Sequence, residues 1–189
     1  MSDISEIIEK PLEELPHNRI NSLVALFVAV SATFMALCNV KDGNIVQAMD
    51  QAQAHALNAW SYFEAKSTKQ NITENTMEVM MNAGASGKDS LIKAYQERIQ
   101  RYEKEKGEAK ARAEGFEKEY DDLNLFDDQF DMTEALLTIA IAMFGITSLT
   151  QKRWLLWFSS AVAMLGIVLG LAAFLRISLH SDLVSRILG

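Results

Sequence analysis

The most regular pattern along the chain is a stripe of apolar positions between residues 92 and 123. Its members recur at alternating steps of three and four residues, which keeps them on one face of an α-helix. The residues between them are mostly charged, as on the solvated side of a helix, so Glu105 and Glu117 are expected to tolerate changes of charge. The stripe consists of Ile92, Tyr95, Ile99, Tyr102, Lys106, Ala109, Ala113, Phe116, Tyr120 and Leu123, and only Lys106 breaks its apolar character.

A second stripe precedes the first and is rich in alanine, which would allow a partner helix to approach closely. Trp60, Tyr62 and Phe63 supply its bulk. Residues 82–89 separate the stripes and contain two glycines with Asn, Ser and Asp, which is a strong turn signal. Because the two arms have similar lengths, we expect an antiparallel helical (coiled-coil) hairpin over residues 41–131. The second stripe consists of Ile45, Met49, Ala52, Ala56, Ala59, Phe63, Ile72, Thr76 and either Val79 or Met80.

Three apolar segments flank this polar hairpin, at residues 20–40, 132–150 and 154–175. Each is long enough to cross a hydrocarbon core of about 30 Å. The first could instead be a cleaved signal peptide, but its leader is acidic and no small-x-small cleavage site follows. The fold class expected is therefore an all-α integral membrane protein with three transmembrane helices and the hairpin between the first and second.

The remaining segments are short. Residues 1–19 form an acidic N-terminal segment, which would be either a surface amphipathic piece or a flexible tail. Residues 176–189 read as a short amphipathic tail. Residues 124–131 are expected to lead the chain from the hairpin back to the membrane, and 151–153 to form a tight turn.

The charges at the ends of the apolar segments predict an orientation. Lys152 and Arg153 lie in a very short loop, and Arg19 abuts the first segment, whereas Asp127 and Asp131 flank the opposite end of the second. Short loops rich in Lys and Arg stay in the cytoplasm. We therefore expect the N-terminus inside and the hairpin outside, although Lys41 and Arg176 would then also be outside.

Composition excludes several classes of function. The chain has 189 residues and a net charge of −7, which argues against nucleic acid as a partner. Its one cysteine, Cys38, permits no intrachain disulfide. Its histidines (His17, His55 and His180) are far apart and lack the spacing of metal or catalytic sites. We expect no catalytic residue, no cofactor and no metal.

Three groups of residues have alternative interpretations. The aromatics of Trp60–Ser67 could form a ligand platform, but packing against a neighbouring helix is favoured. An acidic set could bind a cation, but acidic residues are common at the outer end of a span. Gly166 and Gly170 form a GxxxG motif, and small-residue strips at 25–36 resemble it; both permit close helix packing in a membrane. The acidic set consists of Asp121, Asp122, Asp127, Asp128, Asp131 and Glu134.

Several stretches resemble a bacterial family of small membrane proteins catalogued as a domain of unknown function. The resemblance covers about residues 18–171, and Trp-Ser-Tyr-Phe-x-Ala-Lys-Ser at 60–67 is its most distinctive part. It implies a bacterial inner-membrane protein with this order of helices and no assigned activity, and it supplies no catalytic residue. The stretches are Asn58–Gln70, Lys110–Glu114, Asp128–Leu137 and Leu149–Trp154.

The function expected is that of a non-enzymatic membrane protein that associates with itself, with a structural or scaffolding role. A two-helix hairpin covers one seam and leaves other apolar positions wet, so hairpins of several copies would form a bundle. The alternative is an oligomeric channel or small-solute conduit with the acidic set at its mouth. The interface candidates are Trp60, Tyr62, Phe63, Ile99, Tyr102, Phe116, Gly166 and Gly170.

Overall fold

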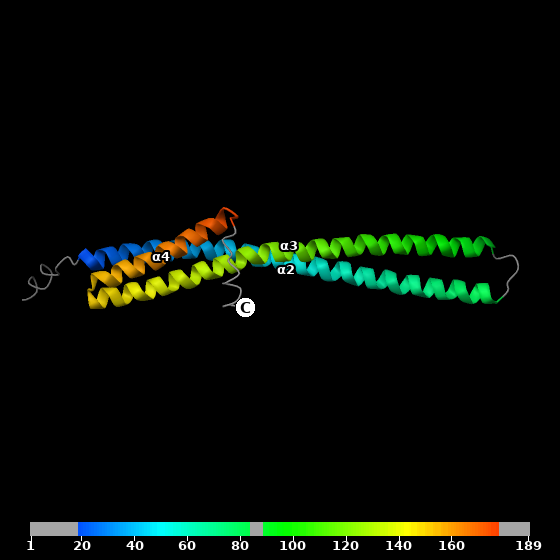
Figure 1. Cartoon of the computed structure of the whole chain (residues 1–189), viewed down its shortest axis with the longest axis horizontal. Coiled ribbons are helices and arrows are strands. Elements are labelled where there is room, and N and C mark those ends of the chain that lie inside the picture. The colour runs from blue at the N-terminus through cyan, green and yellow to red at the C-terminus, as the bar shows by residue number, and fades with distance from the viewer. Residues whose placement is uncertain (1–18, 84–88, 178–189) are drawn as a thin grey trace, which may run out of the picture. The chain divides into compact units, whose positions relative to one another are not determined.

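The computed structural model describes residues 19–83 and 89–177. Over these residues the regular secondary structure consists of three α-helices, α2 (Arg19–Asn82), α3 (Asp89–Thr150) and α4 (Arg153–Phe174) (Figure 1). The predicted all-α class is confirmed. The expectations for residues 1–18, for 84–88 of the turn and for 178–189 of the tail lie outside the described residues.

The first two helices are longer than expected. The first apolar segment and the first arm of the hairpin are one continuous helix of 64 residues, without a break at Gly43. The stretch 124–131, interpreted as a separate re-entry segment, is also helical within the 62 residues of α3. Glycine in a helix interior costs only about 1 kcal/mol, and neither stretch contains the proline that would end a helix.

The described residues divide into two compact units. The first, here called the bundle, comprises residues 19–43 and 125–177. The second, the hairpin, comprises residues 44–83 and 89–124. Helices α2 and α3 each contribute to both units, and α4 belongs to the bundle alone.

In the bundle α2 and α4 run parallel to each other and antiparallel to α3 (Figure 1). Phe144 of α3 lies at the centre, with its ring stacked on Phe27 of α2 at a centroid distance of 5.5 Å. Val24, Ala140 and Ala163 complete this core, one or two from each helix. The buried residues of α3 follow a helical spacing, so one face of α3 packs between the other two helices.

Small side chains allow α4 to lie against its neighbours. A Cβ atom added to Gly166 would come within 3.1 Å of Leu137. One added to Gly170 would meet Phe34 at 2.7 Å and Thr133 at 2.9 Å, closer than real Cβ atoms come. The GxxxG spacing thus serves close packing of helices within one chain.

Two non-glycine residues with positive φ end the helices of the bundle. Gln151, at φ 56°, follows α3 and its N–H donates to the Thr147 carbonyl at 2.9 Å. Arg176, at φ 55°, follows α4; its N–H donates to Ala173 and that of Ile177 to Ala172. These are the αL and Schellman endings, which satisfy carbonyls that the helix leaves unpaired. The αL ending after α3 makes the two-residue turn between α3 and α4 possible.

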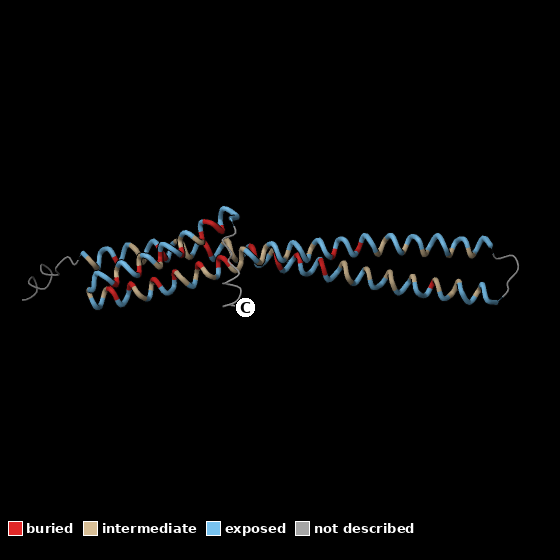
Figure 2. Tube along the Cα trace, in the orientation of Figure 1, coloured by how far each residue is buried: buried red, intermediate tan, exposed pale blue. Residues whose placement is uncertain are grey.

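The hairpin is held by a narrow seam between α2 and α3. All ten residues of the stripe predicted for α3 are buried or half-buried, so the predicted register of this arm is confirmed (Figure 2). Only Ala109 and Ala113 of the ten are fully buried, at 0% exposure. On α2 the buried residues are Ile45, Met49, Ala52 and Ala56, with Thr73 further along.

In the distal part of α2 the predicted stripe is wrong at Ile72 and for the alternative Val79, whereas Thr76 and the alternative Met80 are half-buried as predicted. Ile72 and Val79 are 61% and 68% exposed, whereas Thr73 is buried. From Phe63 the seam continues in steps of three and four through Lys66, Gln70 and Thr73 to Met77 and Met80, which are half-buried. Lys66 and Gln70 have partners across the seam, and the Thr73 hydroxyl donates to the Lys69 carbonyl of its own helix. The spacing of the coiled coil therefore prevails over the hydrophobicity of Ile72.

Candidate functional site

Carboxyl groups from α2 and α3 collect at the end of the bundle where the apolar segments meet polar sequence. Asp42 of α2 forms a side-chain hydrogen bond with Asp127 of α3. Burial raises the pKa of Asp42 to about 6, and the charges of Asp127, Asp131 and Glu134 add to the rise. Burial, and then the charges of Asp127, Glu134 and Asp128, also raises the pKa of Asp131. Asp42 therefore keeps its proton at mildly acid pH.

The carboxyl cluster does not have the arrangement of a metal site. Among the described residues no group of three or more His, Cys, Asp or Glu side chains is arranged to hold a metal ion. Of the acidic set predicted from sequence, Asp127, Asp128, Asp131 and Glu134 contribute to the cluster, joined by Asp42, which the sequence did not mark. The contact of Asp42 with α3 depends on the packing of α2 against α3, which local sequence does not reveal.

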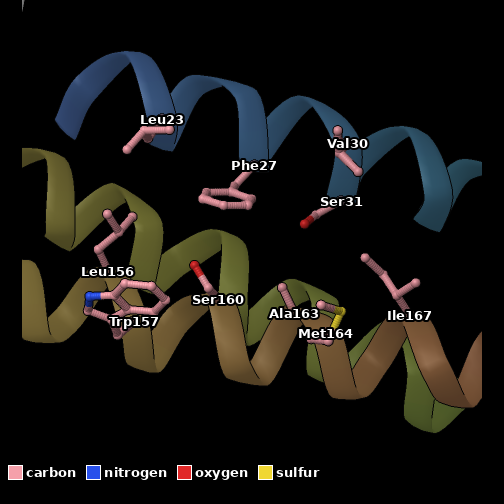
Figure 3. Close-up of a pocket in the computed structure, with 10 residues that line it drawn as sticks. All are labelled: Leu23, Phe27, Val30, Ser31, Leu156, Trp157, Ser160, Ala163, Met164 and Ile167. Carbon is pink, nitrogen blue, oxygen red and sulfur yellow. The ribbon is translucent and has the colours of Figure 1, made fainter. Parts of the chain in front are cut away.

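An apolar groove of about 410 Å³ lies between α2 and α4 in the bundle (Figure 3). The two helices are close where Phe34 lies against Gly170, and the groove opens toward the other end of α4, near Trp157. The hydroxyls of Ser31 and Ser160 are the polar groups that face it. Such a groove suits an apolar chain or helix. It is lined by Leu23, Phe27, Val30, Ser31, Leu156, Trp157, Ser160, Ala163, Met164 and Ile167.

Two cross-seam pairs lie in the predicted aromatic stretch of the hairpin. The Trp60 indole Nε1 donates a hydrogen bond of 2.7 Å to Glu117 Oε1, and its ring meets Phe63 edge-on at 5.6 Å. The Lys66 ammonium lies 2.6 Å from the Glu105 carboxylate. These pairs join α2 to α3 on either side of the apolar seam.

Lys66 also lies over aromatic rings, 4.8 Å from the centroid of Tyr62 and 5.5 Å from that of Tyr102. Hydrogen bonding to Glu105, and then to Tyr62, raises the pKa of Lys66. The bond to Lys66 lowers the pKa of Glu105. Both groups therefore stay charged at neutral pH, and each stabilises the charged form of the other.

Glu105 and Glu117 do not point away from the seam, which was the reason to expect that changes of their charge are tolerated. Each lies beside the stripe on the sequence, but each reaches across to a residue of α2. Long side chains flanking a coiled-coil seam extend over it, as e and g residues do. The signal in the sequence is the position immediately next to seam residues such as Phe116.

The interface candidates are divided between the two units. Trp60, Phe63, Ile99, Tyr102 and Phe116 are half-buried in the hairpin, and Tyr62 is 40% exposed. The structure brings Tyr62 and Tyr102 together around Lys66, whereas Trp60 contacts Phe63 and Glu117 instead. Gly166 and Gly170 are buried within the bundle, where contacts of the same chain account for their small size.

The residues that sequence reasoning missed are the polar members of the hairpin seam. Lys106 Nζ donates to Gln70 Oε1 at 3.0 Å and lies 3.2 Å from Glu103. Lys106 was recognised as the polar break in its stripe. Its partner Gln70 could have been found by continuing the α2 stripe at steps of three and four from Phe63.

A family model matches most of the chain. The model of a family described as a domain of unknown function (DUF4337) matches residues 20–176. No curated protein matches the chain. No solved structure matches it either.

Proposed function

Because the chain belongs to the DUF4337 family, whose function is unknown, we propose a function from its own residues: a multi-pass membrane protein, without catalytic activity, that self-associates through its hairpin. The role would be structural, holding several hairpins together at a membrane surface. The proposed location is the bacterial inner membrane, as the resemblance in sequence implies.

Membrane insertion is supported by the outer surface of the bundle. Each of the three helices contains a segment long and apolar enough to cross a bilayer. Large apolar side chains point outward along all of them, which is unfavourable in water over so continuous a surface. A bilayer would cover these side chains, and helices are the elements that satisfy their own backbone groups there. They include Leu26, Val30, Leu37, Ile146, Trp157 and Leu165.

The orientation is supported by the distribution of charge along the bundle. Asn21 Oδ1 accepts hydrogen bonds from Ser148 (3.1 Å) and Gln151 (2.7 Å), so the start of α2 lies beside the turn between α3 and α4. Arg19, Lys152 and Arg153 therefore share one end of the bundle, and the carboxyl cluster occupies the other. With the basic end in the cytoplasm, the N-terminus is inside and the hairpin is periplasmic.

The proposal of self-association is supported by the small amount of apolar surface that the hairpin buries. Its fully buried seam is made mainly of small residues, and its aromatic residues are half-buried. Large apolar side chains such as Leu57, Ile72 and Val79 remain exposed. Two long helices with one thin seam are marginal alone, because most of the stability of a helix comes from packing of its apolar face. Further helices from other copies would cover the exposed positions.

The test of this function is the mass of the particle formed by the intact chain in mild detergent and in nanodiscs. We expect a defined mass of two or more copies in both. A single copy under both conditions would exclude the proposal.

A channel formed by several copies is a second candidate, favoured by the carboxyl cluster at the outer end of the bundle. The centre of the bundle is filled by Leu137, Ala140 and Phe144, each at 0% exposure. A conduit would therefore lie between copies. Conductance in planar bilayers tests it: a cation current that falls when Asp127 and Asp131 are both replaced by Asn would support a channel. Absence of current from the wild-type oligomer would exclude one.

A further inference from the structure

The seam divides the surface of the hairpin into two faces. Seam residues of α2 include Ala59 and Phe63, and those of α3 include Ala113. A residue that directly follows a seam residue lies about 100° to one side of it, and a residue that precedes it lies as far to the other side. Since α2 and α3 are antiparallel, the following residues of both helices share one face, and the preceding residues share the other.

One face gathers the arginines of the hairpin. Arg98, Arg101 and Arg112 directly precede the seam residues Ile99, Tyr102 and Ala113. Their guanidinium groups lie 5.6–5.9 Å from tyrosine ring centroids. The ion pairs formed among the described residues include none of these arginines. We call this surface the arginine face.

The same face carries exposed apolar side chains. Tyr62, Ile72, Val79 and Leu91 each directly precede a seam position, and all are exposed. Arginine with tyrosine and aliphatic groups is the composition enriched in protein interfaces and their hot spots. The positive charge calls for a partner with carboxylates.

The opposite face of the hairpin carries such carboxylates. Glu64, Glu74 and Glu78 directly follow the seam positions Phe63, Thr73 and Met77. Glu74 accepts a hydrogen bond from Gln70, which leaves its charge in place. None of the three carboxylates forms an ion pair within the described part of the chain. We call this surface the carboxylate face.

The two sets of charges lie at matching levels along the hairpin. Arg112 lies between Glu105 and Glu117, whose partners across the seam are Lys66 and Trp60, so it is level with Glu64. Toward the turn, Lys106 bonds to Gln70. Arg98 and Arg101 follow on that side of the pair, at the level of Glu74 and Glu78.

Between residues 117 and 122 both faces are acidic. The arginine face carries Glu119 and Asp122 there, and the carboxylate face carries Glu117 and Asp121. Like charges opposite each other disfavour contact there. Attraction is therefore confined to the stretch between Tyr62 and the turn.

We propose that the arginine face of one hairpin binds the carboxylate face of a second copy of this chain, side by side and parallel. In this arrangement Arg112 meets Glu64, and Arg98 and Arg101 meet Glu74 and Glu78. The inference rests on the proposed self-association and specifies its surfaces. Copies anchored in one membrane project their hairpins from the same side, so complementary charges at one level come into register. The contact is head-to-tail, and each copy offers one face of each kind, which generates a ring where the rotation closes.

A charge exchange in the intact chain tests this arrangement. One variant combines Arg98→Glu, Arg101→Glu and Arg112→Glu, and the other combines Glu64→Arg, Glu74→Arg and Glu78→Arg. Particle mass is measured in nanodiscs for each variant alone and for the two co-expressed with different tags. The matched control reverses Lys104 and Lys118, which are exposed and lie away from both faces.

Each variant alone is expected to give single copies with unchanged helicity, because both of its faces then carry the same charge. Co-expressed, the two variants should co-purify, since each contact between them joins opposite charges again. Where the wild-type ring has an even number of copies, the two variants can alternate around it and should also regain the wild-type mass. The lysine reversals should leave the mass unchanged.

Failure of the inference differs from failure of the proposed function. If the wild type forms oligomers whose mass neither variant alters, the inference is overturned and self-association stands. If the folded variants do not co-purify with each other, the head-to-tail pairing is wrong. If the wild type consists of single copies, both the proposed function and this inference are wrong. If instead a different protein co-purifies with the wild type and is lost from the variants, the two faces bind that protein, and the pairing of copies is overturned.

Discussion

The indole Nε1 of Trp60 donates a hydrogen bond of 2.7 Å to the carboxylate of Glu117, 57 residues further along the chain. The bond crosses the seam of the hairpin and fixes the level of α3 against α2 at that point. Together with Lys66–Glu105 and Gln70–Lys106, it sets the register of the two arms. The alanines of the seam alone would tolerate a shift of one helical turn, so these polar pairs give the hairpin its specific alignment.

Replacement of Glu117 by Ala should weaken the hairpin by about 0.5–1.5 kcal/mol, because the indole loses its hydrogen-bond acceptor. It should also shift Trp60 fluorescence to longer wavelength as water replaces the carboxylate. The measurement uses a chain with Trp154→Phe and Trp157→Phe, which leaves Trp60 as the only tryptophan. Glu114→Ala is the control, since Glu114 pairs with Lys110 of its own helix; an equal shift in both variants would contradict the contact.

An acidic residue in the seam should unfold the hairpin locally. Ala113 is fully buried and Ala111, two residues earlier, is exposed. Ala113→Asp would place an uncompensated charge between the helices, at a cost of about 3 kcal/mol or more. Ala111→Asp introduces the same residue on the solvated side and should change little. Thermal unfolding followed by circular dichroism distinguishes them, and similar melting curves would show the register to be wrong.

A single methyl group should disturb the bundle at Gly170. The added Cβ of Gly170→Ala meets Phe34 and Thr133 at less than 3.0 Å. Helix α4 must then move or Phe34 must turn, and overpacking of this kind costs about 1–3 kcal/mol. Gly145→Ala is the matched control, because its Cβ meets nothing within 4 Å. It should stabilise helix α3 by up to about 1 kcal/mol, so the two variants should move the melting temperature in detergent in opposite directions.

The carboxyl cluster should make the bundle more stable in mild acid. The pKa of Asp42 is raised from 3.8 to about 6, so the folded chain binds a proton that the unfolded chain has released. Stability attributable to this group therefore falls as pH rises through that window. Asp42→Asn should raise the free energy of unfolding at neutral pH by about 1 kcal/mol after allowance for solvent screening, and with it the melting temperature.

Near pH 5 the benefit of Asp42→Asn should shrink, because the native carboxyl is then already protonated. Asp50→Asn, an exposed position on the same helix, should have little effect at either pH. A benefit of Asp42→Asn that is larger in acid would contradict the direction of the pKa shift.

The proposed orientation predicts which sites an impermeant thiol reagent reaches in intact cells. In a background with Cys38→Ser, a cysteine at Ser90 should react without lysis, because it lies in the hairpin near the turn. A cysteine at Lys152 should react only after lysis. Both positions are exposed, so burial does not limit labelling. The reverse pattern would invert the topology.

The sequence predicts the hairpin well where spacing and hydrophobicity agree. Ile99, Ala109 and Ala113 lie in the seam as expected, since their steps of three and four select one helix face. It misleads where the two criteria disagree: Ile72 is apolar but exposed, and Thr73 is polar but buried. The pairing of Gln70 with Lys106 across the seam explains this outcome, and that pairing requires knowledge of both helices at once.

The candidate sites depend even more on contacts between distant segments. Asp42 meets Asp127, and Gly170 admits Phe34, only because three helices pack together. Composition marks such residues as acidic or small but does not say which neighbours they meet. The continuity of α2 and α3 was also not predicted. A change from apolar to polar sequence suggests the end of a helix, although nothing in the backbone ends the helix there.

The two-residue turn after α3 bears on the order in which the chain assembles. Contacts between α3 and α4, and those between the two arms of the hairpin, close short or moderate loops. The hydrogen bond of Asn21 with Gln151 joins residues 130 positions apart. Closure of long loops is slower than formation of local contacts. We therefore expect α3 and α4 to insert as a pair late in synthesis, and the early segment of α2 to wait in the membrane until they arrive.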